Sequence, residues 1–169
     1  MEMLMKAYKI VVIGDKGVGK TSIISKYLDN QVSKRATIGV DFRSISLENG
    51  KELVIWDIGG QERFTSVAKA YLTGAKLSVL VYDVNSPESL SRVKKWAELL
   101  VKANNGSEIS GILVGNKIDL GKKIDPEKIN EFMQSCPVKI LYHIETSAVT
   151  GERIKDLFKK IRDFFANSK

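Results

Sequence analysis

The sequence predicts an α/β protein with a mostly parallel sheet that helices cover on both faces. Short, nearly continuous apolar runs, typical of strands buried on both sides, recur along the chain, and helical patterns separate them. A chain of 169 residues is long enough for one ordinary domain and too short for two. Because no repeat, low-complexity tract or linker divides it, we expect a single domain over residues 1–169.

The first elements follow from this pattern. An apolar run at residues 9–13 predicts a strand, a glycine-rich break follows it, and residues 20–28 are expected to form a helix. Residues 41–47 alternate apolar and polar side chains, and an Asn-Gly pair separates them from a second strand at 52–56. That pair is a strong signal for a tight turn, so these two strands are expected to form a hairpin.

The remaining elements alternate between strand and helix. A Ser-Pro pair and an Asp-Pro pair mark two helix starts, because the polar residue caps the helix and proline fits its first position. The expected strands lie at 77–82, 111–114 and 138–144, and the expected helices at 87–103, 126–135 and 154–165. Alternating strands and helices of this kind form parallel sheets, whose ligands bind beyond the carboxyl ends of the strands.

The net charge of +7 at pH 7 suggests a polyanion as partner, whether nucleic acid, acidic lipid or nucleotide. The 27 basic residues are scattered, however, and their longest uninterrupted runs are pairs. A tail or arm that binds nucleic acid concentrates such residues. A solvated surface with a basic bias is the simpler interpretation, and no nucleic-acid partner is expected.

The cysteine and histidine content indicates the cellular compartment and limits the kinds of catalysis that are possible. Cys136 is the single cysteine, so the chain cannot form an internal disulfide, which fits a reducing compartment. No apolar run approaches the roughly 20 residues of a membrane span, and the N-terminus lacks a secretory signal. His143, the only histidine, lies in an expected strand, which argues against zinc or histidine catalysis. We expect a cytoplasmic protein.

Residues 14–21 match the pattern G-x-x-x-x-G-K-[ST] between a strand and a helix. Glycines there let backbone N–H groups point at phosphate oxygens, and the helix adds the positive end of its dipole. Lys20 supplies a full charge to the outer phosphates, and the Thr21 hydroxyl can ligate Mg²⁺. We expect nucleotide contacts from Gly14, Asp15, Lys16, Gly17, Val18, Gly19, Lys20, Thr21 and Ser22. The motif predicts a nucleoside triphosphate or another phosphate ligand and does not identify the base.

Two later segments indicate the base. The first is Asn-Lys-Ile-Asp at residues 116–119, and the second is Glu-Thr-Ser-Ala at 145–148; each follows an expected buried strand. The Asp119 carboxylate can accept from both N1–H and N2–H₂ of guanine, and adenine offers no such pair of donors. Together with a phosphate loop at the same edge of the sheet, these segments predict guanine.

On these motifs the chain resembles a small GTPase of the Ras superfamily, and most of all the Rab family, over residues 8–165. The Rab-like parts are Ile-Gly-Val-Asp-Phe at 38–42 and Glu-Arg-Phe at 62–64, whereas Asp-Ile-Gly-Gly-Gln at 57–61 is closer to the Arf pattern. The resemblance implies a P-loop GTPase domain. Its sheet would have six strands, one of them an antiparallel hairpin strand, with about five helices on both faces.

The resemblance also implies roles for single residues. Thr37 would ligate Mg²⁺ and contact the γ-phosphate, Gly60 would donate its N–H to that phosphate, and Gln61 would orient the attacking water. The implied catalytic set is Gln61, Lys20, Thr37 and Gly60, and the implied metal set is Thr21, Thr37 and, through a water, Asp57. The nucleotide-binding set adds Thr37, Gly60, Asn116, Lys117, Asp119, Ser147, Ala148 and Val149 to the phosphate-loop residues.

Within the base site, the resemblance implies four separate contacts. Asn116 would brace the phosphate loop, and Lys117 would lie along one face of the base. Asp119 would select guanine, and the Ala148 N–H would donate to its O6 atom.

Several positions depart from the resembling proteins. Lys16 replaces a small residue, so its ammonium could help hydrolysis, its bulk could obstruct an arginine from a partner, or it could simply point into solvent. Val32 is the nearest match to an aromatic that covers the base, and Val149 replaces a lysine stem on its other side. Because stacking area is lost, we expect faster nucleotide release than in a typical Rab, unless neighbouring groups compensate.

The last residues, 164–169, contain neither a C-a-a-X box nor a terminal cysteine pair. We therefore expect no intrinsic lipid anchor in this chain. Either a tail has been removed or the protein works without a lipid, and peripheral membrane association would then need partners or the missing tail.

The function expected from these observations is that of a regulatory GTPase. It would bind GTP or GDP with Mg²⁺, hydrolyse GTP slowly, and switch the 33–42 and 57–72 segments between partner-binding states. Effectors, and activating and exchange proteins, would be its protein partners in trafficking or signalling, and a monomer is expected. The alternatives are a nucleotide-gated interaction module with negligible hydrolysis, an adenine-specific P-loop kinase or ATPase, and a nucleic-acid binder.

Overall fold

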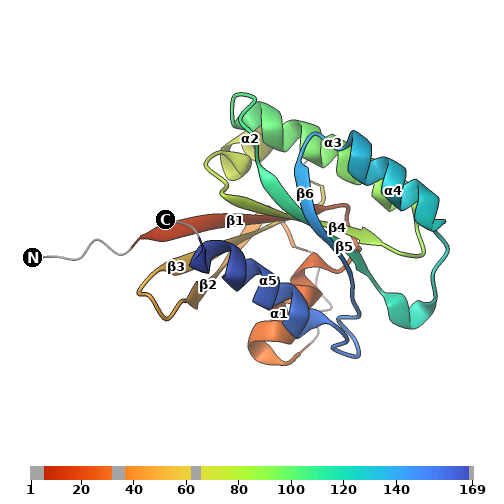
Figure 1. Cartoon of the computed structure of the whole chain (residues 1–169), viewed down its shortest axis with the longest axis horizontal. Coiled ribbons are helices and arrows are strands. Elements are labelled where there is room, and N and C mark those ends of the chain that lie inside the picture. The colour runs from red at the N-terminus through yellow and green to blue at the C-terminus, as the bar shows by residue number, and fades with distance from the viewer. Residues whose placement is uncertain (1–5, 32–36, 62–65, 168–169) are drawn as a thin grey trace, which may run out of the picture.

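The computed structural model describes residues 6–31, 37–61 and 66–167, and the strands within them form one six-stranded sheet. The strands are β1 (Ala7–Gly14), β2 (Val40–Ser46), β3 (Glu52–Ile58), β4 (Leu77–Asp83), β5 (Ser110–Asn116) and β6 (Lys139–Glu145). They lie in the order β2-β3-β1-β4-β5-β6 (Figure 1). All neighbours are parallel except β2 and β3, which run antiparallel. The predicted sheet is confirmed.

Helices cover both faces of this sheet. They are α1 (Lys20–Asp29), α2 (Ser66–Leu72), α3 (Pro87–Ala103), α4 (Pro126–Ser135) and α5 (Ile154–Ala166). Helices α1 and α5 pack together on one face, and α2, α3 and α4 pack on the other (Figure 1). The expected arrangement of about five helices on two faces is confirmed, although sequence patterning alone does not locate α2.

The two helices whose starts are predicted from a capping residue followed by proline begin where predicted. The Ser86 hydroxyl accepts from the Ser89 N–H at 3.2 Å, and Pro87 occupies the first position of α3. The Asp125 carboxylate accepts from the Glu127 N–H at 3.0 Å at the start of α4. In both helices the capping side chain satisfies a backbone N–H that has no partner inside the helix, and the proline at the first position has no N–H that would need one.

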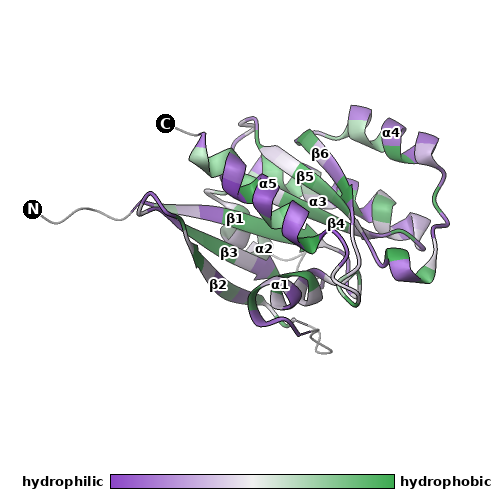
Figure 2. Cartoon of the chain, turned by 60° about the horizontal axis from the view of Figure 1, so that its bottom comes forward, coloured by the Kyte–Doolittle hydropathy of each residue, from purple (hydrophilic) through white to green (hydrophobic). Residues whose placement is uncertain are grey.

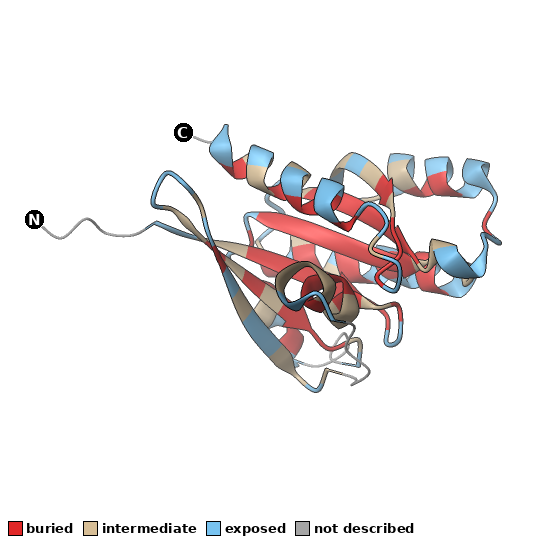
Figure 3. Ribbon diagram, turned by 90° about the horizontal axis from the view of Figure 1, so that it is seen from below, coloured by how far each residue is buried: buried red, intermediate tan, exposed pale blue. Residues whose placement is uncertain are grey.

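The core consists of two apolar layers, one on each side of the sheet. Along β1, Ile10 and Val12 face the α1–α5 layer, whereas Val11 and Ile13 face the layer of α2, α3 and α4. Apolar residues therefore fill both faces of this strand. The central strands are largely hydrophobic in Figure 2 and largely buried in Figure 3. The predicted apolar face of α5 is buried, and its members are Ile154, Leu157, Phe158, Ile161 and Phe165.

The topology places the candidate site at one edge of the sheet. β1 pairs with β3 on one side and with β4 on the other, so successive strands are added first on one side of β1 and then on the other. In doubly wound sheets the crevice at this reversal, beyond the carboxyl ends of the strands, is where ligands bind. The loop after β1 lies there, and the parallel partners β3, β5 and β6 end at the same edge.

Burial of α5 makes a prediction about stability. Leu157 is fully buried against the sheet, so we expect Leu157→Ala to lower the free energy of unfolding by about 2–5 kcal/mol through lost burial and a residual cavity. The control Val67→Ala removes the same kind of side chain from an exposed position of α2 and should change it by less than about 0.5 kcal/mol. Urea unfolding measures both, and equal losses would contradict the assigned packing.

Candidate functional site

The loop between β1 and α1 folds around the amino group of Lys20. That group donates to the carbonyl oxygens of Gly14 at 2.8 Å and Asp15 at 2.9 Å. Burial lowers the pKa of Lys20 to about 8, and the carboxylates of Asp57 and Asp15 oppose that shift. Carbonyl oxygens thus hold a cation at the mouth of the loop, which is the position from which it would meet an anionic ligand.

Gly19, the last residue before α1, has a backbone conformation and surroundings that exclude a side chain. Its φ is 100°, in the left-handed region, and a Cβ atom there would overlap the side-chain nitrogen of Asn116. The glycine in the motif is therefore required twice, once by backbone conformation and once by the close approach of Asn116.

Three oxygen-bearing side chains from separate segments converge beside Lys20. The Thr21 hydroxyl donates to Asp57 Oδ2 at 2.5 Å and is hydrogen-bonded to the Thr37 hydroxyl, which lies 3.4 Å from the same Oδ2 atom. Thr21 begins α1, Asp57 lies near the end of β3, and Thr37 precedes β2. The structure therefore brings together the three side chains that the sequence predicts as metal ligands.

The Asp57 carboxylate is poorly satisfied by the protein alone. Asp57 is buried, and its Oδ1 atom has no hydrogen-bond partner among the described residues. Burial raises the pKa of this carboxyl, against the hydrogen bond from Thr21 and the charge of Lys20. A buried polar atom without a partner is costly, and oxygen donors of this kind are what Mg²⁺ prefers. The residues present therefore fit a magnesium ion.

The segment after β3 packs directly on the phosphate loop. The Gly59 N–H donates to the Gly39 carbonyl at 2.8 Å, which links this segment to the residues that precede β2. A Cβ atom on Gly60 would lie 2.6 Å from the carbonyl carbon of Asp15 and 2.7 Å from Lys16 Cα, so only glycine allows this approach. Gln61 and Lys16 are both exposed beside this contact.

The side chain of Asn116, at the end of β5, joins two loops. Its amide donates to the Val18 carbonyl of the phosphate loop at 3.0 Å. Its Oδ1 atom accepts from the Thr146 hydroxyl at 3.1 Å and from the Ala148 N–H at 3.2 Å, both in the loop after β6. The predicted bracing contact is thus present in the geometry. The Ala148 N–H, predicted to meet a base, is engaged by Asn116 in this structure.

The other residues of the predicted base site lie close to one another. Lys117 Nζ donates to the Gly17 carbonyl at 2.5 Å, and it lies 3.3 Å from the Asp83 carboxylate. Asp119 is exposed, and its Oδ1 atom accepts from the Ser147 hydroxyl at 2.8 Å. Ser147 is buried. The segment after β5 therefore contacts the phosphate loop through Lys117 and the loop after β6 through Asp119, so both side chains stand at one rim of the site.

Of the two substitutions expected to weaken packing on the base, the structure describes only Val149. Val149 is 63% exposed directly after the base-site loop, so its short side chain covers little. Val32 and residues 62–64 lie outside the described residues. The expectation of faster nucleotide release therefore remains a prediction.

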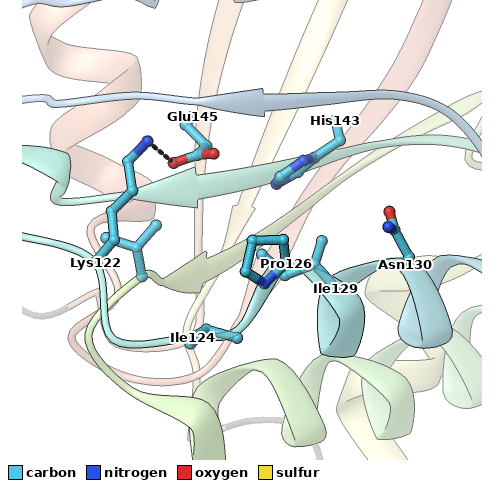
Figure 4. A pocket seen from close by; sticks show the side chains of 8 residues that line it. Lys122, Ile124, Pro126, Ile129, Asn130, His143 and Glu145 are labelled. Carbon is cyan, nitrogen blue, oxygen red and sulfur yellow. Dashed lines mark ion pairs between the residues drawn. The ribbon is translucent and has the colours of Figure 1, made fainter.

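A pocket of about 210 Å³ lies behind the base-site loops, between β6 and α4 (Figure 4). The Lys122 ammonium and the Glu145 carboxylate form an ion pair of 2.7 Å at one end of it. His143 projects into it from β6, and its Nε2 atom is hydrogen-bonded to the Tyr82 hydroxyl at 2.7 Å. Burial lowers the pKa of His143. The ion pair ties the loop after β5 to the end of β6, which helps to fix the base-site loops.

Sequence reasoning misses one contact of the phosphate loop. Arg92 of α3 forms an ion pair of 2.5 Å with the Asp15 carboxylate, although 77 positions separate the two residues. Neither motif nor periodicity connects them, so no signal in a single sequence identifies the pair. Among the described residues, no group of three or more histidine, cysteine, aspartate or glutamate side chains could hold a metal ion.

The phosphate loop, the threonine–aspartate cluster and the base-site loops together define a P-loop GTPase. Comparison with known proteins agrees: the model of the Ras family matches residues 9–166. The Ras-related protein RABA5d of Arabidopsis thaliana is 37% identical over 166 residues, which are 95% of this chain and 75% of that protein. The Ras-related protein RABA5e of the same plant is 38% identical over 159 residues, 91% of this chain and 72% of that protein.

The chain belongs to the Ras family of small GTPases, and it is Rab-like. No helix within residues 6–31, 37–61 and 66–167 is both long and apolar enough to cross a membrane.

The bridging role of Asn116 can be tested without any ligand. Asn116→Ala removes three hydrogen bonds and leaves buried partners on both loops unsatisfied, so we expect the free energy of unfolding to fall by about 2 kcal/mol or more. The matched control Asn130→Ala lies on the exposed face of α4 and should cost less than about 0.5 kcal/mol. Urea unfolding of the nucleotide-free chain gives both values, and an Asn116→Ala loss no larger than the control would refute the bridge.

Proposed function

We propose that this chain is a regulatory GTPase that binds GTP and GDP with Mg²⁺ and hydrolyses GTP slowly to GDP and phosphate. The observation that carries this proposal is the convergence of Thr21, Thr37 and Asp57 beside Lys20, with one Asp57 oxygen buried and unpaired. A cation and a set of oxygen donors at the mouth of a glycine-rich loop suit a triphosphate and its magnesium ion.

Thr21 and Thr37 would hold the ion through their hydroxyl oxygens, and Asp57 would hold it through a water. When bound, the ion would supply positive charge that offsets the negative charge on the outer phosphates. The short contacts among the three side chains support this assignment, because they bring these oxygen atoms to one place.

The phosphates would lie on the loop between β1 and α1. Lys20 would exchange the carbonyl oxygens of Gly14 and Asp15 for phosphate oxygens, which are fully charged and therefore stronger partners. Glycines of the loop, together with Val18, Thr21 and Ser22, would direct backbone N–H groups at the same oxygens.

The base would lie at the rim formed by Asp119 and Lys117. The Asp119 carboxylate would accept from N1–H and N2–H₂ of guanine, and the Ser147 hydroxyl already orients that carboxylate. Lys117 would cover one face of the ring. The Ala148 N–H would have to share its contact with Asn116 or leave it in order to reach O6.

Hydrolysis would proceed by direct attack of a water on the γ-phosphorus, without a covalent intermediate. Gln61 would orient that water, and the Gly60 N–H would stabilise the charge on the γ-phosphate. The close packing of Gly60 on the Asp15–Lys16 peptide supports this, because it places the Gly60 backbone at the phosphate end of the loop.

Loss of the γ-phosphate would release Thr37 and Gly60 together. The hydrogen bond from Gly59 to Gly39 supports a coupled response, because it joins the segment that holds Thr37 to the segment that holds Gly60. Release of the 33–42 and 57–72 segments would be the signal that partners read.

An apolar surface beside these segments would bind protein partners. Ile38 is 90% exposed and Phe42 is 51% exposed, and the Phe42 ring meets Trp56 edge to face with centroids 4.6 Å apart. Exposed aromatic and aliphatic groups rimmed by polar residues are typical of protein interfaces. We infer regulation of a trafficking or signalling step, by a monomer, through effectors and through activating and exchange proteins.

One experiment tests the binding proposal. We expect the chain to bind GTP and GDP more tightly than ATP, and removal of Mg²⁺ with a chelator to weaken GTP binding. Asp119→Ala should weaken guanine nucleotides on the order of a hundredfold, because two hydrogen bonds to a charged acceptor are lost. The control Asp156→Ala removes a carboxylate from the exposed face of α5 and should leave affinity unchanged.

Fluorescent-nucleotide titration measures these affinities. ATP affinity equal to that for GTP would revive the adenine-specific alternative. Binding that falls steeply with salt for any polyanion, regardless of base, would favour the nucleic-acid binder.

A second candidate function is a nucleotide-gated module with negligible hydrolysis, and the exposed Lys16 beside Gly60 favours it. Single-turnover hydrolysis of bound GTP separates the two. We expect measurable turnover that Gln61→Leu lowers at least tenfold, because the water is no longer oriented. Absence of turnover in the unaltered chain would establish the module instead.

Lys16→Gly, measured with and without an activating protein, tests the role of Lys16. A changed rate in the variant alone means that the ammonium acts on the phosphate. A change only with the activating protein means that the side chain obstructs the partner, and unchanged rates in both mean that Lys16 points into solvent.

A further inference from the structure

The phosphate loop of this chain contains a carboxylate that no step of the proposed function uses. Asp15, the second residue of the loop, is 8% exposed. A buried negative charge at this position lowers the positive potential that a polyphosphate needs, since charges a few ångströms apart interact strongly where water is excluded. Its charge reaches Lys20, whose pKa it helps to raise. A positive charge beside Asp15 offsets this effect.

Arg92 supplies that positive charge from α3. Its Nη1 atom lies 2.5 Å from Asp15 Oδ2, and this hydrogen bond raises the pKa of the guanidinium further. The Asp15 side chain is 11% exposed and the Arg92 side chain is 47% exposed, so the pair joins a buried anion to a cation at the surface. Arginine suits this task because it stays charged and pairs with carboxylates in a defined direction.

The pair also holds the surface on which the segment after β3 rests. Gly60 packs against the peptide that joins Asp15 to Lys16, with no room for even a methyl group. A displacement of Asp15 would therefore move the platform under Gly60. Helix α3 holds Arg92 in place, since Val93 and Trp96, which follow Arg92 on the helix, are fully buried.

We propose that Arg92 is a positioning residue that neutralises Asp15 and fixes the Asp15–Lys16 peptide, and so favours GTP over GDP in the site. This inference rests on the proposed function, because it assumes a guanine nucleotide on the loop. GTP carries an additional phosphate at the Gly60 end of the site, so loss of the Arg92 charge beside Asp15 disfavours GTP more than GDP. Loss of the platform also affects only the nucleotide that Gly60 contacts.

A double-mutant cycle tests the proposal. The affinities of GDP and of a non-hydrolysable GTP analogue are measured with Mg²⁺ for the unaltered chain, Arg92→Ala, Asp15→Asn and the double variant. We expect Arg92→Ala to lower the ratio of GTP-analogue affinity to GDP affinity about fivefold, in the range of a partly exposed ion pair. Asp15→Asn should restore the ratio in the double variant, because no charge is then left to neutralise.

Two further variants separate charge pairing from other effects. Lys95→Ala removes one positive charge from an exposed position of the same helix, and it should leave the ratio unchanged. Arg92→Lys keeps the charge without the directed fork and should keep most of the ratio. The effect of Arg92→Ala should shrink between about 0.05 M and about 0.5 M salt, because salt screens the exposed side of the pair.

The outcomes distinguish this inference from the proposed function. Equal affinity ratios in the unaltered chain and in Arg92→Ala would overturn the inference while tight guanine-nucleotide binding still stood. A loss in Arg92→Ala that Asp15→Asn does not repair would also overturn it, because the effect would then be structural rather than electrostatic. An unaltered chain that binds neither nucleotide would overturn the proposed function and this inference with it.

Discussion

The candidate site depends on a single buried amide. Asn116 holds the phosphate loop through the Val18 carbonyl and the loop after β6 through Thr146 and Ala148. It thereby sets the spacing between the part of the site that suits phosphates and the part that suits a base. Gly19 lacks a side chain because the Asn116 amide occupies that space. Two sequence motifs about a hundred residues apart are thus two sides of one contact.

Two charged groups of the site, the Lys20 ammonium and the Asp57 carboxylate, are buried. Lys20 is buried and donates to two carbonyl oxygens, and Asp57 is buried with one oxygen that has no hydrogen-bond partner among the described residues. Burial shifts the pKa values of both groups toward the neutral form, against the charges and hydrogen bonds of their neighbours. A phosphate would relieve the first group and a divalent cation the second.

Most of the fold can be predicted from the sequence because its signals are local. The apolar run at residues 9–13, the caps at Ser86 and Asp125, and the apolar face of α5 each involve neighbours along the chain. Much of the site can be predicted too, but for a different reason. Thr37 is assigned by resemblance to known GTPases, since its own surroundings in the sequence carry no sign of Asp57 twenty positions away.

The rest depends on side chains that meet only after folding. Arg92 and Asp15 are joined by the packing of α3 beside β1, and Tyr27 stacks on Phe158, at a centroid distance of 3.9 Å, through the packing of α1 on α5. Such pairs follow from helix placement, which a single sequence does not specify at the level of individual side chains.

The antiparallel edge of the sheet has a mechanical consequence. β2 begins and β3 ends at the same rung, where Val40 faces Ile58, and the bond from Gly59 to Gly39 extends that ladder by one step. Thr37 and Gly60 therefore lie just beyond the same end of this ladder, one on each strand, so we expect a force on one segment to reach the other through the bond from Gly59 to Gly39.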